Sequence, residues 1–243
     1  MENTIHISSL YKQFADVCAV DKISFSAQTG DVIALLGPNG AGKSTLMNMI
    51  AGLLSADDGD IIIDGFNIKQ NPTDAKKLIG FLAEGAPMYG DMRVKNFLSY
   101  MADLKGILPK DKIQRLTAVK EMAQIADVWN MKIETLSKGY QRRVGFAQSI
   151  LSDPPILLLD EPTDGLDPNQ KEHIRQLVKQ LGEHKIILIS THLLDDVEQM
   201  CNRIMIMNRG AIIADGVKQK ILEQAKAFSL ESAFRKLTGG SYV

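Results

Sequence analysis

The chain has 243 residues, 45% of them apolar and 23% charged, which is the balance of a soluble globular protein with one domain or two tightly joined ones. This composition excludes collagen-like, disordered and disulfide-scaffold classes. Lysine and arginine total 28 against 29 for aspartate and glutamate, so no strong net charge favours a polyanion. We therefore expect no nucleic-acid partner.

The sequence lacks the patterns of a cysteine metal site, of a signal peptide and of a membrane-spanning helix. The two cysteines, Cys18 and Cys201, are too few and too far apart for a metal site, and we expect them to be small buried residues. The first residues lack the basic and apolar regions of a signal peptide. No apolar run approaches the roughly 20 residues of a membrane helix, so any membrane-spanning helices must come from another polypeptide.

The first part of the chain alternates between short apolar runs and turn signals. Such runs predict strands at Thr4–Ser8, Ile23–Ala27, Val32–Leu36 and Ile61–Asp64. A further apolar strand is expected from Ile79 to Ala83.

Helical periodicity then prevails up to about Gln148. Apolar residues recur at three and four positions from Val94 to Leu104, where Gly106 would end a helix. A second helix is expected over Lys110–Val128, and a third over Arg142–Leu151.

The last part of the chain returns to apolar strands, at Ile156–Leu159 and Ile186–Ile189, which are typical of buried parallel strands. Between them lies a helix with Asp167 as N-cap, Pro168 in its first turn and Gly182 at its end. The remaining segments predict a hairpin over 203–215 that turns at 208–210, and one amphipathic helix from 217 to a loose Gly239-Gly240. The elements together predict an α/β core with an all-helical insertion in its middle.

The clearest motif is Gly37-Pro38-Asn39-Gly40-Ala41-Gly42-Lys43-Ser44, which fits the phosphate-binding pattern G-x-x-x-x-G-K-[ST]. It follows a predicted strand and opens a helix expected over Thr45–Leu54. In this context backbone N–H groups wrap phosphates at a helix N-terminus. Lys43 can reach the β- and γ-phosphates, and the Ser44 hydroxyl can ligate Mg²⁺.

Two carboxylates, Asp160 and Glu161, end the apolar strand that begins at Ile156. Open α/β sheets bind ligands at this edge. Asp160 can hold Mg²⁺ through water, and Glu161 can polarise the water that attacks the γ-phosphate. Without the phosphate-binding loop, such a pair could equally cap a loop.

A second candidate anion site begins at Ser137, followed by Lys138, Gly139, Tyr140 and Gln141. A serine and a glycine at a helix N-terminus can bind an anion, although Ser137 can also be a simple N-cap. Two such helix ends in one short chain suggest that the second serves the nucleotide of a partner.

These residues resemble the nucleotide-binding subunits of ATP-binding cassette (ABC) transporters, over nearly the whole chain and in family order. Gly37 to Thr45 is similar to the Walker A motif, and Ile156 to Glu161 to Walker B with its catalytic glutamate. Leu136 to Tyr140 is similar to the signature motif LSGGQ, which that family places against the γ-phosphate bound by the other subunit.

The resemblance implies further roles. Asp167 matches the D-loop aspartate, and His192 matches the switch histidine that contacts the γ-phosphate. Lys12-Gln13-Phe14 resembles a segment whose aromatic residue stacks on adenine, with Tyr11 as the rival of Phe14. The alternatives are a core role for Phe14, a plain N-cap for Asp167 and an ordinary loop histidine for His192.

The sequence departs from the family pattern at two places. Lys138 and Tyr140 stand where the common signature has glycine and glutamine, and Gln141 lies one position later than the usual glutamine. Glu84 replaces the glutamine of the Q-loop. A carboxylate there can still ligate Mg²⁺, or Glu84 can be a solvated loop residue.

The fold that the resemblance implies is a P-loop NTPase core with a mostly parallel sheet, an N-terminal antiparallel β subdomain and an inserted helical subdomain. We divide the chain into a core at about 1–83 and 152–216, a helical subdomain at about 84–151, and a helical tail at about 217–243.

The function that the resemblance implies is ATP hydrolysis by two copies, or by this chain with a related subunit, which sandwich two Mg-ATP. The sandwich would drive integral membrane permease subunits at the cytoplasmic face of the membrane. Segments 84–89 and 229–238 resemble the ABC-2 exporter group and favour export. The alternatives are an importer and a soluble, non-transport ABC ATPase.

Overall fold

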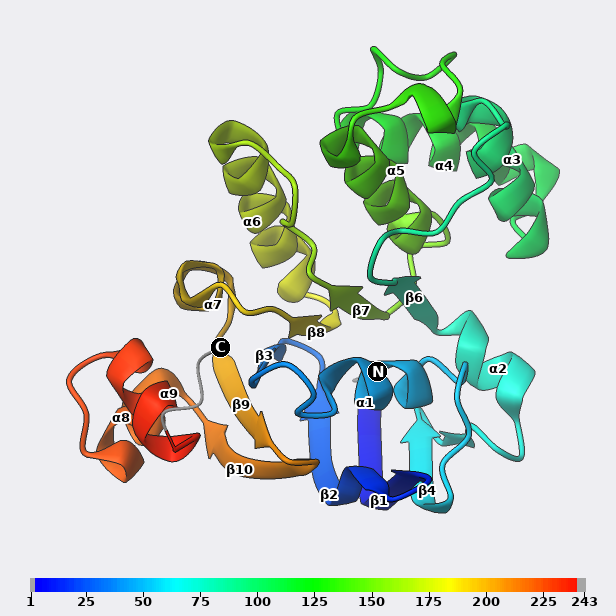
Figure 1. Cartoon of the computed structure of the whole chain (residues 1–243). Helices are drawn as coiled ribbons and strands as arrows, with labels where there is room; N and C mark the ends of the chain where they lie inside the picture. Colours follow the sequence, from blue (N-terminus) through cyan, green and yellow to red (C-terminus); the bar gives the residue numbers. More distant parts are fainter. Residues whose placement is uncertain (1–2, 240–243) are drawn as a thin grey trace.

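The computed structural model describes residues 3–239 and contains two β-sheets (Figure 1). The first has the strand order β2-β1-β4-β5 with antiparallel pairing throughout. The second has the order β10-β9-β3-β8-β7-β6 and is parallel except for the β9–β10 hairpin. The strands are β1 (Thr4–Phe14), β2 (Val17–Gln28), β3 (Val32–Leu36), β4 (Asp58–Ile63), β5 (Phe66–Asn67), β6 (Ile79–Leu82), β7 (Ile156–Asp160), β8 (Ile186–Ser190), β9 (Arg203–Asn208) and β10 (Ala211–Gly216). The α/β class and the two kinds of sheet are as predicted.

The first two strands are about twice as long as predicted. Their pairing is interrupted by register shifts after Ile7 and after Leu10, and Ser9 has a positive φ of 47°. Such irregularities break the apolar alternation on which a strand prediction depends. The hairpin turn, in contrast, is where it was expected, with positive φ at Arg209 and Gly210.

Helix α1 (Lys43–Ile50) lies between the two sheets (Figure 1). It packs into one hydrophobic cluster with alternate residues of the parallel strands, among them Leu35, Leu158 and Leu188. The intervening residues, such as Leu157 and Ile189, face a second cluster formed with the helical insertion. The parallel strands are therefore buried on both faces, which explains their continuous apolar sequence. The helix begins two residues before the predicted 45–54, and it ends at Ile50 because Gly52 adopts a positive φ and turns the chain.

The helical insertion follows α2 (Pro72–Lys77) and β6 and ends at β7. It contains α3 (Val94–Leu104), α4 (Pro109–Met122), the short 3₁₀-helix η1 (Ile133–Thr135) and α5 (Lys138–Ile150). The predicted helix over Lys110–Val128 is confirmed up to Met122 and is wrong over its last third, residues 123–128. The chain leaves α4 after Met122 because Gln124 has a left-handed φ of 50°, while Ile125 and Val128 stay buried as part of a loop.

Between β7 and the end of the described residues at 239, there are four helices: α6 (Pro168–Gly182), α7 (Leu194–Met200), α8 (Lys218–Ala225) and α9 (Leu230–Leu237). The prediction of one helix from residue 217 is wrong, since Lys226 adopts a left-handed conformation and separates α8 from α9. The two helices pack on each other and on the β9–β10 edge (Figure 1). Gly239 is described and Gly240 lies outside the described residues.

Within residues 3–239, no helix combines the length and the apolar character needed to cross a membrane. Both cysteines are free thiols and are half-buried rather than fully buried as predicted. Burial of the Cys201 thiol raises its pKa to about 12, so it stays protonated.

The insertion meets the core at a close backbone approach. A Cβ atom added to Gly80 in β6 would lie closer than 3.0 Å to the carbonyl oxygen of Ser149 in α5, and also to Pro154 and Leu157. Only glycine lets β6 and the end of α5 come this close. The contact therefore fixes where α5 lies relative to the sheet.

We expect Gly80→Ala to lower the free energy of unfolding by about 1–3 kcal/mol, because a methyl group there overpacks a backbone contact. Gly90→Ala is the matched control, since its added Cβ would meet only ordinary contacts at 3.4 Å or more. We expect that variant to change stability by less than about 0.5 kcal/mol. Urea unfolding of both proteins measures the difference, and equal stabilities would contradict the tight contact.

Candidate functional site

The loop between β3 and α1 is pressed against neighbouring backbone. Gly42 has a φ of 99°, and a Cβ added there would lie closer than 3.0 Å to the carbonyl oxygen of Ala19. A Cβ on Gly37 would lie 2.6 Å from the carbonyl oxygen of Met207. The loop therefore needs glycine at both positions to curve around the N-terminus of α1.

Lys43 reaches back across this loop. Its Nζ donates hydrogen bonds to the carbonyl oxygens of Gly37 at 2.7 Å and Pro38 at 3.1 Å. The ammonium group thus lies inside the curve of the loop, at the first residue of a helix, where backbone N–H groups favour an anion.

The charged groups beside this loop are partly desolvated. Burial lowers the pKa of Lys43, and the carboxylates of Glu161, Asp160 and Glu84 oppose that shift. Burial raises the pKa of Asp160, while hydrogen bonds from Ser190 and Ser44 lower it. Both charges are partly desolvated, so a bound anion with a cation would stabilise both.

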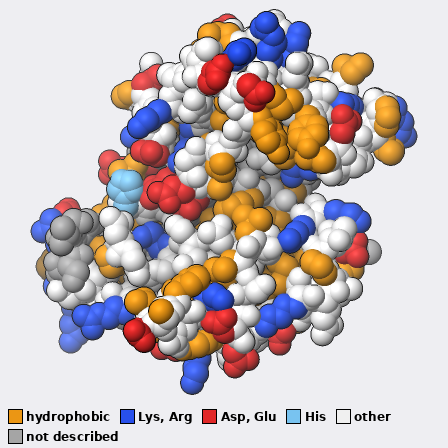
Figure 2. Space-filling view, turned by 45° about the vertical axis from the view of Figure 1, so that its right-hand side comes forward, with side chains coloured by type: hydrophobic (Ala, Val, Ile, Leu, Met, Phe, Trp, Pro, Cys, Tyr) orange, Lys and Arg blue, Asp and Glu red, His pale blue; other side chains and the backbone are white. Residues whose placement is uncertain are grey.

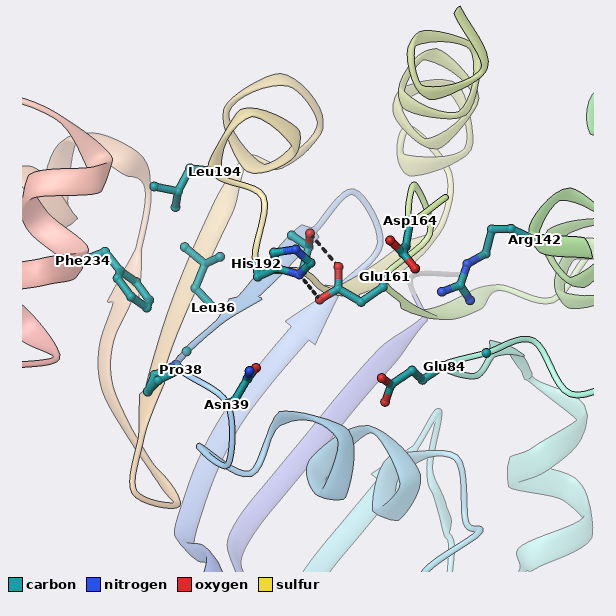
Figure 3. Close-up of a pocket in the computed structure, with 13 residues that line it drawn as sticks. Leu36, Pro38, Asn39, Glu84, Arg142, Glu161, Asp164, His192, Leu194 and Phe234 are labelled. Atoms are coloured by element: carbon teal, nitrogen blue, oxygen red, sulfur yellow. Dashed lines mark hydrogen bonds and ion pairs between the residues drawn. The ribbon is translucent and has the colours of Figure 1, made fainter. Parts of the chain in front are cut away.

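Glu161 is held at the carboxyl end of β7. Its backbone φ is 49°, and its N–H donates to the carbonyl oxygen of Ser190 on β8 at 2.8 Å. Its carboxylate accepts a hydrogen bond from Thr191 Oγ1 at 3.2 Å and lies 2.9 Å from His192 Nδ1 (Figure 3). Three contacts with the end of β8 therefore set the direction of this carboxylate.

Two adjoining cavities open beside these residues. One of about 410 Å³ is lined by the loop residues 39–45 together with Glu84, Asp160 and Glu161. The other, of about 540 Å³, is lined by Pro38, Asn39, Glu84, Glu161, His192 and Arg142, among others (Figure 3). Glu84 and Glu161 line both cavities, so they stand at the boundary between them.

Oxygen atoms suited to Mg²⁺ converge on the smaller cavity, from Ser44, Asp160 and Glu84. The described part of the chain has no group of three or more histidine, cysteine or acidic side chains that could hold a metal by themselves. This donor set fits Mg²⁺, which proteins commonly bind through one or two carboxylates completed by substrate phosphates.

The aromatic candidates lie near the far end of the same cavity. Phe14 is 47% exposed, which excludes a role in the core, and it pairs with Val17, a residue that lines the smaller cavity. Lys12 Nζ lies 5.3 Å from the centre of the Phe14 ring. Tyr11 pairs instead with Asp58 on β4, and its hydroxyl donates to Gln13 at 2.6 Å. Of the two aromatic candidates, Phe14 is thus the one whose strand partner lines the cavity.

Ser137 and its neighbours form a separate group. Ser137 caps α5, with its hydroxyl accepting from the N–H of Tyr140 at 3.3 Å, and Gln141 donates to the carbonyl oxygens of Ile133 and Leu136. Asp167 caps α6 by accepting from the N–H of Gln170 at 3.0 Å. Residues 137–140 are absent from the lining of both cavities. The predicted site residues therefore fall into two groups, one at the cavities and one at the N-terminus of α5.

Gly139 brings the second group against the segment before α6. A Cβ on Gly139 would lie 3.1 Å from the carbonyl oxygen of Gly165, and one on Gly165 would lie 3.5 Å from Lys138 Cβ. The start of α5 is thus packed on residues 165–166 of the same chain.

Two features of the site were not predicted. Arg142 is buried, lines the larger cavity and donates to the carbonyl oxygen of Ala83 at 3.0 Å. The available sequence signal is its spacing of four residues from the apolar Phe146, which places it on the buried face of α5.

The second such feature is the buried carboxylate of Asp196 in α7. It accepts hydrogen bonds from Thr163, two residues after Glu161, and from Arg175 Nε in α6 at 2.8 Å. It thereby connects the segment after β7 with α6 and α7. No local pattern in the sequence indicates this network.

Comparison with known proteins gives the same family as the motifs. The sequence model described as "ABC transporter" matches residues 20–164. The linearmycin resistance ATP-binding protein LnrL of Bacillus subtilis (strain 168) is 35% identical over 215 residues, which is 88% of this chain and 69% of that protein.

Two solved structures share the fold. One, described as the structure of the ATP-binding subunit of an ABC transporter, superposes with a TM-score of 0.90 at 25% identity, covering 96% of this chain and 99% of that one. The other, described as the dimeric structure of MJ0796, a bacterial ABC transporter cassette, has a TM-score of 0.81 at 25% identity and covers 88% and 98%. The chain thus belongs to the ABC transporter family, as an ATP-binding subunit that hydrolyses ATP.

Proposed function

We propose that two copies of this chain, or this chain and a related subunit, enclose two Mg-ATP and use their hydrolysis to drive a membrane permease in export. The observation that carries the proposal is the position of Glu161, held by Thr191 and His192 at the boundary of two cavities beside Lys43. This arrangement places a base next to a phosphate-binding loop.

ATP binding rests on the loop from Gly37 to Thr45. Its N–H groups would surround the phosphates, and the Lys43 ammonium would exchange its two carbonyl partners for phosphate oxygens. Ser44 and Asp160, with Glu84, would hold Mg²⁺, which supplies charge neutralisation for the phosphates. Phe14, exposed at the end of β1, would stack on the base.

Hydrolysis rests on Glu161 and His192. Glu161 would accept a proton from the attacking water, since it is the carboxylate that faces the larger cavity and is anchored on two sides. His192, whose side chain is 61% exposed, orients Glu161 and can reach the γ-phosphate.

We expect Glu161→Gln to leave ATP binding intact and to slow turnover by roughly 10²–10⁴, the usual contribution of a general base. Lys43→Ala should instead weaken ATP binding itself, because it removes the cation within the loop. Equilibrium binding and steady-state hydrolysis by the purified proteins separate the two effects. Turnover near wild type in Glu161→Gln would remove Glu161 from the mechanism.

The sandwich arrangement explains the second group of residues. Ser137 and Gly139 begin α5, an anion-favouring helix end that faces neither cavity of its own chain. In a pair of subunits this end, including Lys138 and Tyr140, would face the partner's γ-phosphate, and Asp167 would lie near the interface. The similarity to a cassette described as dimeric supports this pairing.

We expect Mg-ATP to induce dimers most visibly in the Glu161→Gln background, where hydrolysis is slow. Adding Ser137→Arg should abolish these dimers, because the arginine side chain is larger than that of serine and would occupy the space of the partner's nucleotide. Sedimentation with and without Mg-ATP is the measurement. Equal dimer content in both proteins would leave Ser137 as an N-cap only.

The permease contact is assigned to a third cavity, of about 450 Å³, between the core and the helical subdomain. Its lining is mostly apolar and includes Phe81, Met88, Tyr89, Phe97 and Met101. Figure 2 shows hydrophobic side chains gathered on the upper, helical part of the molecule, above the hollow between the two parts. An apolar groove of this kind suits a short helix of a membrane protein.

Export is the direction that the relatives favour. The similarity to a resistance protein fits the removal of a compound from the cell. Segments 84–89 and 229–238 resemble the ABC-2 exporter group, which supports the same direction.

We expect Tyr89→Glu, at the exposed rim of the groove, to reduce recovery of the chain in the membrane fraction of its host by severalfold, because a charge in an apolar contact is unfavourable. Leu108→Glu is the control, as Leu108 is similarly exposed but does not line the groove. Equal membrane recovery of both variants would exclude this groove as the permease contact.

A further inference from the structure

Arg142 is a buried cation with an unusual set of neighbours. It is 5% exposed, and its Nη1 donates to the carbonyl oxygen of Ala83 at 3.0 Å. Within residues 3–239, no carboxylate oxygen lies within 4.0 Å of its guanidinium. A buried arginine normally has such a partner, because an unpaired buried charge is costly.

The carboxylates around Arg142 lie across the larger cavity. Figure 3 shows its side chain extending from α5 toward Glu161 and Asp164, with Glu84 below it in the same half of the view. Burial lowers the pKa of Arg142, and Asp164, Asp160, Glu161 and Glu84 oppose that shift through space. The positive charge of Arg142 is thus balanced by several carboxylates at a distance and not by one ion pair.

The neighbouring Arg143 shows what a purely structural arginine looks like on this helix. It is equally buried, donates to the carbonyl oxygen of Gln124 at 2.7 Å and stacks on the ring of Tyr140 at 4.2 Å. It lines neither of the two cavities at the phosphate-binding loop. Of the two buried arginines of α5, Arg142 therefore faces the cavity and Arg143 does not.

The charge around the cavities depends on position 84. Four carboxylates (Glu84, Asp160, Glu161 and Asp164) line the two cavities, and the cations beside them are Lys43 and Arg142. A glutamine at position 84, as in the common pattern of the family, would leave one negative charge fewer. Glu84 directly follows Ala83, whose carbonyl oxygen Arg142 binds, so Arg142 holds the segment from which Glu84 extends.

We propose that Arg142 and Glu84 form one functional unit. Arg142 positions the Ala83–Glu84 segment and offsets the negative charge of the Glu84 carboxylate while the site is empty. When Mg²⁺ binds with a nucleotide, the Mg²⁺ offsets that charge instead. The proposal rests on the function proposed above. Arg142 is a positioning residue in this unit, acting through Glu84.

The unit has a consequence for communication along the chain. Arg142 lies five residues after Ser137, on the helix whose N-terminus would face the partner's nucleotide. A movement of the segment that carries Glu84 therefore reaches α5 through the hydrogen bond between Arg142 and Ala83. Binding of nucleotide at one site is in this way connected to the N-terminus of α5, the surface that would close on the nucleotide of the partner.

The test is a double-mutant cycle of Arg142→Gln and Glu84→Gln, read by binding of a non-hydrolysable ATP analogue during Mg²⁺ titration. Glu84→Gln should raise the half-saturating Mg²⁺ concentration, because a carboxylate binds this cation better than an amide. Arg142→Gln should lower it by about threefold where the exposed Glu84 is present, and should leave it nearly unchanged where residue 84 is glutamine.

Urea unfolding without nucleotide gives a second readout. We expect Arg142→Gln to raise the unfolding equilibrium constant by about threefold more in the Glu84 protein than in the Glu84→Gln protein, because only the former has the carboxylate to offset. Equal effects in both backgrounds, in unfolding and in Mg²⁺ dependence, would overturn the proposal.

Two further variants guard against a purely structural explanation. Arg142→Lys keeps the charge and should retain a Mg²⁺ midpoint close to that of the wild type. Arg143→Gln should change the unfolding curve but not the Mg²⁺ midpoint, and a shifted midpoint would mean that general destabilisation causes the effect.

If the double-mutant cycle gives a negative result, the variant Lys43→Ala shows whether the Arg142–Glu84 unit alone or the proposed function as a whole is wrong. If it binds the ATP analogue as well as the wild type does, the nucleotide site itself is misassigned. If it loses binding while the cycle is additive, only the Arg142–Glu84 unit is refuted.

Discussion

The site depends on one constraint, the burial of strands β3, β7 and β8 on both faces. A strand with apolar clusters on either side cannot carry functional polar groups along its length, because each would be desolvated without partners. The polar residues therefore follow at the strand ends. Because these strands are parallel, their carboxyl ends meet at one edge, where the loop after β3, Glu161 after β7 and His192 after β8 come together.

The helical subdomain is attached to this edge through backbone rather than through side-chain packing alone. Gly80 lets β6 approach Ser149 of α5, and Gly145 of α5 lies against Leu82 and Ala86, where a Cβ would come within 3.0 Å of both side chains. Arg142 adds a hydrogen bond to Ala83 in between. The segment that leads into the insertion is thus in contact with α5 along several residues, so its position and that of the N-terminus of α5 depend on each other.

The parts of this architecture that sequence could predict are those with a local cause. The loop from Gly37 to Ser44 is recognisable because its spacing, its strand and its helix are contiguous, and the N-caps Ser137 and Asp167 depend on hydrogen bonds three residues away. The end of α4 was misplaced because the apolar pattern continues through Ile125 and Val128, which are buried in a loop and not in a helix. The role of Arg142 depends on Ala83, 59 positions away, and no periodicity reports such a contact.

The contact between Glu161 and His192 cannot by itself determine where the histidine lies. The His192 side chain is 61% exposed, and a contact made by so exposed a side chain contributes little because solvent screens it and the side chain stays free to turn. Four residues later, Asp196 is fully buried and accepts hydrogen bonds from Thr163 and Arg175. Removing one partner of such a buried pair typically costs about 3–5 kcal/mol. Glu161 and Thr163, which follow β7, thus contact His192 and Asp196, which follow β8. Of these two contacts, the buried one between Thr163 and Asp196 is the stronger. The Thr163–Asp196–Arg175 network therefore joins the two segments that carry Glu161 and His192, and it stabilises their approach more than the exposed contact does.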